Sequence, residues 1–182
     1  NGFGRMGRLG FRAGWDKNEF SLVQVNEIAT DAIGSAHLLK FDSVHGSWNH
    51  ETSAKENKMI VDDQDILYSS NREITDSDWS GCDIVIEATG KHHKNPESLN
   101  DYFAQGVKKV IVAAPTEGAL NIVYGINDDQ YEADKHHLVT AASCTTNCLA
   151  PVVKVMNESL GIKHGCMTTI HDITNTQTIV DK

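Results

Sequence analysis

Short apolar runs alternate with amphipathic segments along most of the chain, which is the pattern of an α/β protein. The runs with strand character are residues 22–25, 58–61, 65–68, 82–88, 109–114, 121–124 and 138–142, and the segments with helical spacing are residues 8–15, 32–41 and 96–105. Runs 58–61 and 65–68 flank Asp62-Asp63-Gln64, which predicts an antiparallel hairpin at a sheet edge. We therefore expect a doubly wound sheet built mainly of parallel strands.

The last part of the pattern predicts a longer helix followed by a strand. Ser143 stands where a cap would open a helix that includes the amphipathic stretch 149–160, and Gly161 stands where that helix would end. An apolar face is supplied by Val152, Val153, Val155, Met156 and Leu160. A final strand is expected from Cys166 to His171.

Composition narrows the class of protein. The 182 residues are 40% hydrophobic and 23% charged, and the formal net charge is −9. This charge argues against nucleic acid as a partner, and no apolar stretch reaches the ~18 residues that a membrane span needs. Without secretory features, the four cysteines favour free thiols, and the His and Cys spacings do not suggest a metal site. We expect a cytoplasmic protein with neither nucleic acid nor membrane as partner.

The chain opens on a glycine pattern, NGFGRMG over residues 1–7. In a dinucleotide-binding βαβ unit such a turn follows a strand and opens a helix, so the first strand is expected to be missing. Gly2 and Gly4 would let the backbone approach a pyrophosphate, and Gly7 completes the pattern. The amides of Arg5 and Met6 would stabilise the phosphate charge together with the helix dipole.

Glu27 follows Gly7 by 20 residues (27 − 7) and stands at the end of a predicted strand. This is the spacing of an acid that accepts hydrogen bonds from an adenosine ribose. A carboxylate there would repel a 2′-phosphate, which favours NAD over NADP. The alternative is a solvated carboxylate with no ligand.

Cys144 is predicted to lie at a helix N-terminus, where the helix dipole and nearby amides favour the thiolate. The hydroxyls of Ser143, Thr145 and Thr146 surround it with donors for an anionic substrate group. The alternative is a buried, inert cysteine, the common state of a free thiol. Cys148, one turn further along, is interpreted as a packing residue.

His171 ends the last predicted strand and precedes a polar run, residues 172–177. A lone histidine in this setting would usually be structural. Paired in space with Cys144, it becomes a base that removes the thiol proton and later exchanges it with a substrate oxygen.

Several blocks, taken together and in order, closely resemble phosphorylating glyceraldehyde-3-phosphate dehydrogenases. They are NGFGRMGR at residues 1–8, FDSVHG at 41–46, EATG at 87–90, ASCTTNCLAP at 142–151 and TTIH at 168–171. The resemblance implies an NAD-binding Rossmann-type domain over residues 1–143, and the beginning of a truncated α+β catalytic domain over residues 144–182. It also implies a homotetramer for the complete protein.

By this resemblance, Cys144 attacks the aldehyde of glyceraldehyde 3-phosphate, NAD receives hydride, and inorganic phosphate cleaves the thioester, with His171 as base. Ser143, Thr145 and Thr174 match positions that contact substrate or inorganic phosphate. The matching cofactor positions are Gly2, Gly4, Arg5, Met6, Gly7, Glu27, Arg72, Thr89 and Ala113.

Three departures from the family pattern qualify this assignment. The ribose acid is Glu27 where the family usually has Asp, and Ala113 replaces a common Ser, so that only a backbone contact is possible there. Residues 172–177 read DITNTQ where the family usually has AYTATQ. This variant, with HHLVTAA at 136–142, resembles a branch linked to arsenate resistance, which gives the hypothesis that arsenate replaces phosphate as acceptor.

Two other functions stay open at this point. A sister enzyme such as erythrose-4-phosphate dehydrogenase shares the glycines, the thiol and the histidine. The chain could also be a dinucleotide-binding module without chemistry. Because the family places further substrate and nicotinamide contacts after the position of Lys182, we expect this chain alone to be inactive.

Overall fold

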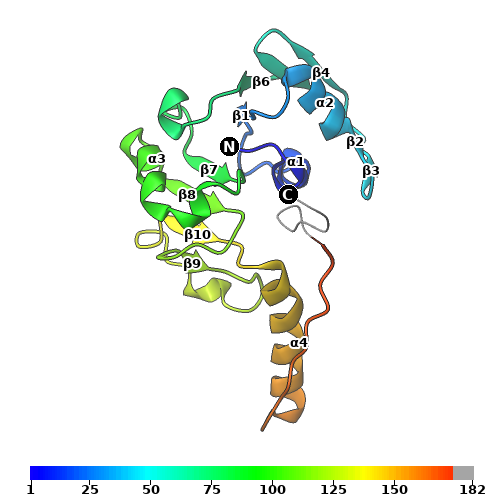
Figure 1. Cartoon of the computed structure of the whole chain (residues 1–182), viewed down its shortest axis with the longest axis vertical. Coiled ribbons are helices and arrows are strands. Elements are labelled where there is room, and N and C mark those ends of the chain that lie inside the picture. Colours follow the sequence, from blue (N-terminus) through cyan, green and yellow to red (C-terminus); the bar gives the residue numbers. More distant parts are fainter. Residues whose placement is uncertain (174–182) are drawn as a thin grey trace, which may run out of the picture.

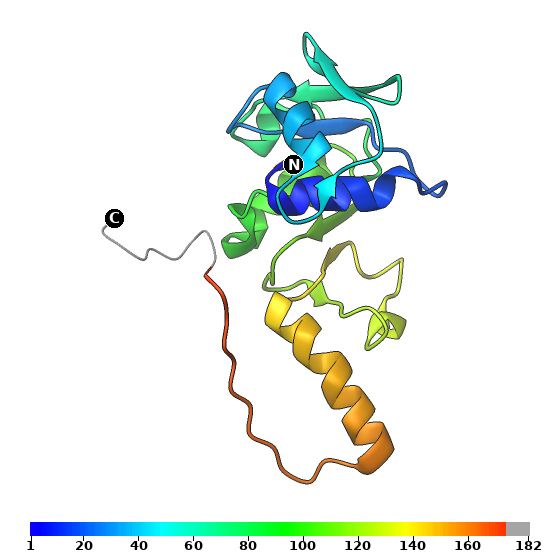
Figure 2. The same cartoon turned by 90° about the vertical axis from the view of Figure 1, so that its right-hand side faces the viewer.

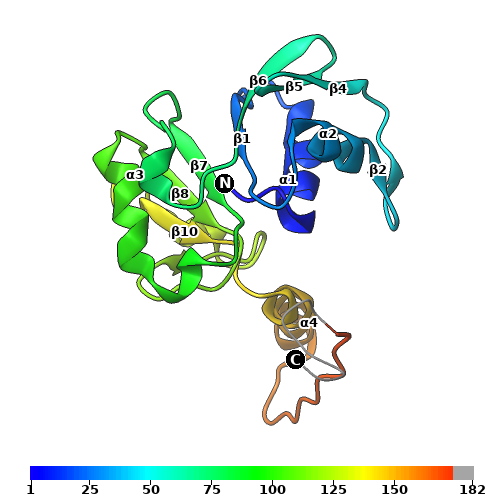
Figure 3. The ribbon, with the colours of Figure 1, turned by 45° about the horizontal axis from the view of Figure 1, so that its top comes forward.

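The computed structural model describes residues 1–173 of the chain. Two four-stranded sheets lie on either side of the N-terminus, and one long helix projects away from them (Figures 1 and 3). The strands of the first sheet follow the order β1-β6-β5-β4, and those of the second follow β7-β8-β10-β9. The predicted α/β class is therefore confirmed.

The first sheet contains β1 (Gln24–Asn26), β4 (Thr52–Lys55), β5 (Lys58–Val61) and β6 (Gln64–Ser69). β5 and β6 form the predicted antiparallel hairpin, and β1 pairs in parallel with β6. The hairpin is not the outermost part of the sheet, because β4 pairs with β5 and forms the edge. The small antiparallel pair β2 (Phe41–Asp42) and β3 (Gly46–Ser47) follows α2.

Helices α1 (Arg5–Trp15) and α2 (Ala32–Lys40) accompany the first sheet. Asp31 caps α2 by accepting from the amide of Gly34 at 2.8 Å. α1 begins three residues earlier than predicted, and its N-cap is Gly4, which has no side chain to signal a helix start. Phe11 of α1 and Leu39 of α2 are buried in the core that these helices share with the sheet.

The second sheet contains β7 (Ile84–Glu87), β8 (Lys109–Val112), β9 (Leu120–Asn121) and β10 (Leu138–Thr140), all paired in parallel. Its core includes Trp79, Leu99, Tyr102 and Val110. The helix predicted at residues 96–105 is a 3-10 turn (Pro96–Leu99) that continues into α3 (Asn100–Ala104). Further 3-10 turns are Ile74–Asp76, His92–Lys94 and Asp128–Gln130.

The strand predicted at residues 121–124 is wrong for most of its length, because the ladder ends at Asn121. The side chain of Asn127 accepts from the amide of Val123 at 2.8 Å and donates to the carbonyl of Asn121 at 2.9 Å. Gly125 then adopts a φ of +79°. These contacts turn the chain away from the sheet.

The long helix is α4 (Cys144–Leu160), and it begins and ends where the sequence predicts. Gly161 follows it with a φ of +75°. The apolar residues predicted to form its face, such as Val155 and Leu160, are exposed in the described part of the chain. Figure 2 shows the chain after α4 running back beside the helix.

The strand predicted from Cys166 to His171 is wrong for the described structure. These residues are exposed and belong to no ladder. A strand needs a neighbour for its backbone groups, and no segment of residues 1–173 pairs with this one.

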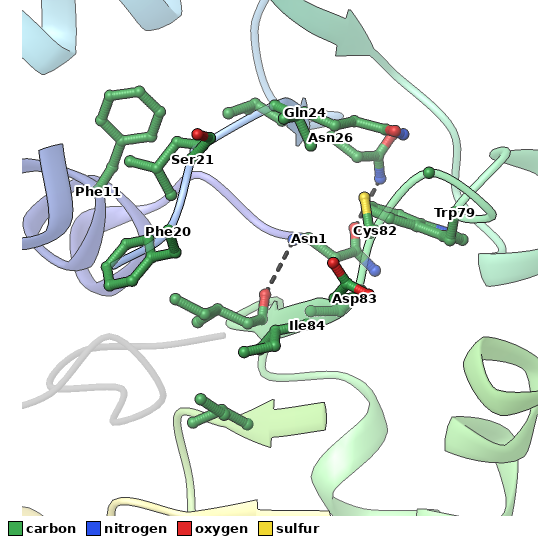
Figure 4. A pocket seen from close by; sticks show the side chains of 18 of the residues that line it. Asn1, Phe11, Phe20, Ser21, Gln24, Asn26, Trp79, Cys82, Asp83 and Ile84 are labelled. Carbon is green, nitrogen blue, oxygen red and sulfur yellow. Dashed lines mark hydrogen bonds between the residues drawn. The ribbon is translucent and has the colours of Figure 1, made fainter. Parts of the chain in front are cut away.

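β1 and β7 are end strands of the two described sheets, and a groove of about 510 Å³ lies between them (Figure 4). Asn1 is one of the residues that line this groove, and it bonds to both sides. Its backbone N donates to Ile86 O at 2.9 Å, and its side chain accepts from Asn26 Nδ2 at 2.7 Å. The N-terminal residues therefore link the two sheets.

Candidate functional site

The glycine turn lies between the carboxyl ends of β1 and β7. Gly2 N donates to Asn26 O at 2.9 Å, and Ala88 N donates to Asn1 O at 2.8 Å. Gly2 has a φ of +83°, and a Cβ atom there would lie 2.5 Å from the amide nitrogen of Thr89. Only glycine meets both constraints.

Gly4 and Gly7, the other two glycines of the turn, have different surroundings. A Cβ on Gly7 would lie 2.1 Å from Gly2 O, so Gly7 lets α1 approach the turn closely. A Cβ on Gly4 would meet nothing within 4 Å. Gly4 therefore faces open space, where a phosphate can approach the uncapped amides of the first turn of α1.

A pocket of about 290 Å³ opens in front of this turn. Five of the predicted cofactor residues line it together, namely Gly2, Gly4, Glu27, Arg72 and Thr89. The structure thus brings together residues that are up to 87 positions apart (89 − 2). The walls come from both sheets, as expected for a ligand site at the carboxyl ends of parallel strands.

Glu27 is held by the backbone on both of its carboxylate oxygens. Oε2 accepts from Phe3 N at 2.6 Å, and Oε1 accepts from the amides of Ile28 and Ala29, each at 2.8 Å. Its carboxylate is therefore fixed at the rim of the pocket next to the glycine turn. These contacts fix the position of the Glu27 carboxylate, and its role toward a ribose stays a prediction.

The other residues of the pocket wall were not among the predicted site residues, and they are Asn1, Asn26, Ile28, Ala29, Asn71, Ala88 and Lys91. Lys91 Nζ pairs with Glu73 Oε1 at 2.9 Å, and this ion pair holds the pKa of the Glu73 carboxyl below its usual value. The position of Lys91 just after the EATG block was the available signal for it.

Four predicted cofactor residues do not line this pocket. The guanidinium of Arg5 points to Asp42 at 3.1 Å, and the Met6 side chain is exposed. Gly7 lies behind the turn. The amide of Ala113 donates to Glu87 O at 2.9 Å, which leaves its carbonyl as the remaining backbone group for a ligand.

The pocket has the features that a dinucleotide requires. It offers the amides at the start of α1 for a diphosphate, open space at Gly4, and a fixed carboxylate at Glu27 for ribose hydroxyls. Arg72 and Lys91 add positive charge along the wall. The residues present therefore fit NAD.

The predicted thiol and base lie together at the start of α4. Cys144 Sγ is 3.2 Å from His171 Nε2, and both side chains are exposed. His171 Nδ1 lies 2.6 Å from the carbonyl of Asp172. A carbonyl only accepts, so Nδ1 carries a proton and Nε2 is free to accept the thiol proton.

The electrostatics of this pair favour proton transfer. The hydrogen bond with His171 is the largest cause that lowers the pKa of the Cys144 thiol, and hydrogen bonds from the amide and hydroxyl of Thr145 add to it. The pKa of His171 is raised, first by its hydrogen bond to the Asp172 carbonyl and then by Cys144. The two pKa values thus move toward a thiolate and imidazolium pair.

The neighbouring hydroxyls differ in what they are free to do. Ser143 Oγ accepts from Thr146 N at 3.0 Å and lies 2.7 Å from Thr146 Oγ1, so it caps α4. Thr145, next to Cys144 in the first turn of α4, contributes to the lowered pKa of the thiol. Thr174, the third predicted substrate residue, lies outside the described residues.

Two other kinds of site are absent from residues 1–173. No three His, Cys, Asp or Glu side chains gather in the way that a metal ion needs. No helix in that range is both long and apolar enough to cross a bilayer.

The parallel strand pairs, the glycine turn and the pocket at the strand ends define a dinucleotide-binding protein of the Rossmann type. Residues 1–95 match the family model described as glyceraldehyde 3-phosphate dehydrogenase, NAD binding domain, and residues 143–182 match that described as the C-terminal domain. The chain belongs to the glyceraldehyde-3-phosphate dehydrogenase family.

Individual relatives agree with this assignment. The chain is 58% identical over 184 residues to glyceraldehyde-3-phosphate dehydrogenase 3 of Nostoc sp., 46% to glyceraldehyde-3-phosphate dehydrogenase 1 of Bacillus cereus, and 44% to glyceraldehyde-3-phosphate dehydrogenase of Geobacillus stearothermophilus. Each match covers 100% of this chain and 54% of the relative. The chain thus spans about half the length of these curated relatives.

Proposed function

We propose that the complete protein to which this chain belongs oxidises glyceraldehyde 3-phosphate with NAD and inorganic phosphate. The observation that carries the proposal is the contact of 3.2 Å between Cys144 Sγ and His171 Nε2 at the N-terminus of α4. A thiol with a lowered pKa beside an imidazole nitrogen that can accept its proton is the arrangement that nucleophilic attack on an aldehyde requires.

In the proposed reaction, Sγ of Cys144 bonds to the aldehyde carbon while its proton passes to Nε2 of His171. The imidazolium then donates to the aldehyde oxygen, which gives a hemithioacetal. His171 takes this proton back as the carbon is oxidised to a thioester. A phosphate oxygen then attacks the thioester carbon, and Cys144 leaves as a thiolate that the imidazolium stabilises.

The cofactor part of the proposal concerns the pocket at the glycine turn. NAD supplies the hydride acceptor for the oxidation step. The amides at the start of α1 hold its diphosphate, Glu27 accepts from the adenosine ribose, and Arg72 lies by the adenine. Thr89 and the backbone of Ala113 complete the proposed contacts.

The substrate part is supported by the donors around Cys144. We assign Ser143, Thr145 and Thr174 to the binding of substrate or inorganic phosphate. Thr145 follows Cys144 directly in the first turn of α4, and its amide and hydroxyl help to lower the pKa of the thiol. Ser143 would have to share its oxygen with the cap of α4.

The division of the chain belongs to the same proposal. Residues 1–143 form the NAD-binding domain and residues 144–182 begin the catalytic domain, which is supported by the C-terminal family match from residue 143. The groove between the end strands β1 and β7 is the seat that we propose for one further parallel strand of the first domain. We also propose a homotetramer and a cytoplasmic location, by analogy with the family.

Two alternatives remain as outcomes of the test. Steady-state NADH formation by the complete protein would be measured with glyceraldehyde 3-phosphate, with erythrose 4-phosphate, and with phosphate or arsenate as acceptor. We expect turnover with glyceraldehyde 3-phosphate that is lost in Cys144→Ser. A higher kcat/KM with erythrose 4-phosphate would shift the assignment to the sister enzyme.

The same assay distinguishes phosphate from arsenate as acceptor, and an enzyme from a dinucleotide-binding module without chemistry. Arsenate turnover above the phosphate rate supports the arsenate hypothesis, and no arsenate turnover would remove it. We expect no NADH from the 182-residue chain alone. If the complete protein binds NAD but oxidises no aldehyde, it is a binding module and the proposed reaction is wrong.

A further inference from the structure

Glu87 ends β7 and carries a buried carboxylate directly behind the pocket wall. The residue is 2% exposed, and among the described residues the positive charge that interacts with it is the α-ammonium group of Asn1. Buried carboxylates are costly unless donors satisfy both oxygens. Here four donors meet one carboxylate.

These donors come from three separate parts of the chain. Oε1 accepts from the amide of Thr89 at 2.9 Å and from the Thr89 hydroxyl. Oε2 accepts from the hydroxyl of Tyr102 at 2.6 Å and from Nδ2 of Asn1 at 3.0 Å. Glu87 therefore ties the glycine turn, the loop after β7 and helix α3 to a single point.

Two of these partners are themselves walls of the cofactor pocket. Asn1 belongs to the glycine turn and Thr89 to the loop after β7, and both line the pocket. The two walls also pack directly, since a Cβ atom on Gly2 would lie 2.5 Å from Thr89 N. Glu87 is therefore hydrogen-bonded to both walls of the pocket.

The network continues from Asn1 toward the adenosine side of the pocket. Asn26 Nδ2 donates to Asn1 Oδ1 at 2.7 Å, and Asn26 Oδ1 accepts from Asn71 N at 2.8 Å. Asn26 also donates to Asn71 O at 2.9 Å. Asn26 and Asn71 are therefore held by several hydrogen bonds that do not involve Glu87. A substitution of Glu87 should leave these bonds, and so the adenosine side of the pocket, in place.

We propose that Glu87 is a positioning residue that sets the spacing between the glycine turn and the Thr89 loop, and so the binding of the diphosphate half of NAD. It does not line the pocket and acts through Asn1 and Thr89. The proposal rests on the cofactor site proposed above and is independent of the thiol chemistry.

Substitution by glutamine gives a direct test, because the side chain keeps its size. The NH2 group of glutamine replaces either Oε1 or Oε2, and donors point at both of these positions. The Thr89 amide or the Asn1 side chain therefore loses its acceptor. One wall then has to move. Adenosine is the control ligand, because it shares the adenosine half of NAD but has no phosphate. Its binding is expected to depend on Glu27 and Arg72 and not on the glycine turn.

Dissociation constants for NAD and for adenosine would be measured by NMR titration of the 182-residue chain and its variants. We expect Glu87→Gln to weaken the binding of NAD by about tenfold, as for loss of a hydrogen bond to a charged group. The binding of adenosine should weaken by less than about twofold. Asp83→Asn is the control, since Asp83 lies just before β7 at its opposite end and pairs with Lys108 on the surface. It should change neither constant.

Tyr102→Phe provides a second variant if Glu87→Gln does not fold. It removes one donor to Oε2 and keeps the ring, which packs against Trp79 at 5.4 Å between centroids. The binding of NAD should again weaken more than the binding of adenosine. Unchanged NAD affinity, or equal weakening of both ligands, would overturn the positioning role alone. Failure of the unmodified chain to bind NAD would overturn this role and the proposed cofactor site together.

Discussion

His171 Nε2 lies 3.2 Å from Cys144 Sγ, although 27 positions (171 − 144) separate the two residues in the chain. The thiol is fixed by the capped start of α4, and the chain after α4 returns along the helix to bring the imidazole to it (Figure 2). Because the other ring nitrogen donates to the Asp172 carbonyl, the tautomer suits acceptance of the thiol proton.

The titration of His171 should report this contact. Its pKa is raised above the value of about 6.5 for a free histidine, so the imidazolium should persist to higher pH than in an unpaired histidine. In Cys144→Ser the contribution of the thiol is lost, and the pKa should fall while the Asp172 contribution remains. Ring proton shifts followed by NMR over pH 5–9 measure both. A pKa that Cys144→Ser leaves unchanged would contradict the pairing.

Substitution by alanine should affect stability at Gly2 and NAD binding at Gly4. Gly2→Ala places a Cβ on backbone with φ +83° and against Thr89 N, so it should destabilise the fold by more than about 1 kcal/mol. Gly4→Ala meets nothing within 4 Å and should leave stability nearly unchanged, while its methyl group enters the space in front of α1 and weakens NAD binding.

Chemical denaturation and NAD titration of the same two variants separate these effects. Equal stability losses in Gly2→Ala and Gly4→Ala would show that the close approach of Gly2 to Thr89 is not important. Unchanged NAD affinity in Gly4→Ala would place the diphosphate elsewhere.

Glu27 should govern the choice between NAD and NADP. Glu27→Gln removes the charge that opposes a 2′-phosphate, so the ratio of the two dissociation constants should move toward NADP by roughly tenfold. Affinity for NAD should also fall, because an amide cannot accept from Phe3, Ile28 and Ala29 in the same way. Titrations with both cofactors measure the ratio. The contrary result is an unchanged ratio.

The sequence predicted the local features of the site well, because each depends on a short pattern. The cap at Ser143, the thiol at the start of α4 and the helix end at Gly161 are all confirmed. The strands at Ile84–Glu87 and Lys109–Val112 were predicted from their continuous apolar runs. Their parallel pairing is also confirmed.

Contacts between distant parts of the chain were not predictable in this way. Nothing in the EATG block shows that Glu87 meets Tyr102 and Asn1, because these bonds span 15 and 86 positions. The segment Cys166–His171 has the apolar content of a strand, but pairing requires a neighbour that no local pattern reveals. Local signals thus gave the parts of the site, and tertiary contacts set their spacing.

The cap of α4 should contribute to both stability and reactivity. Ser143→Ala removes the acceptor for Thr146 N, which should cost roughly 1 kcal/mol and loosen the first turn around Cys144. Ser159→Ala, in the last turn of the same helix, is the control and should not destabilise it. Hydrogen exchange at the Thr146 amide measures the local effect. Equal protection of this amide in both variants would be inconsistent with the cap.

The most direct measurement for the account as a whole is the rate at which iodoacetamide modifies each cysteine at pH 7, followed by mass spectrometry. Cys148 is the matched control, since it is also exposed and lies one turn along α4, whereas Cys82 is buried and burial raises the pKa of its thiol. We predict that Cys144 reacts at least about tenfold faster than Cys148, as a lower thiol pKa implies, and that His171→Ala removes most of this advantage. Equal rates at Cys144 and Cys148, or a Cys144 rate that His171→Ala leaves unchanged, would contradict the proposed nucleophile and base.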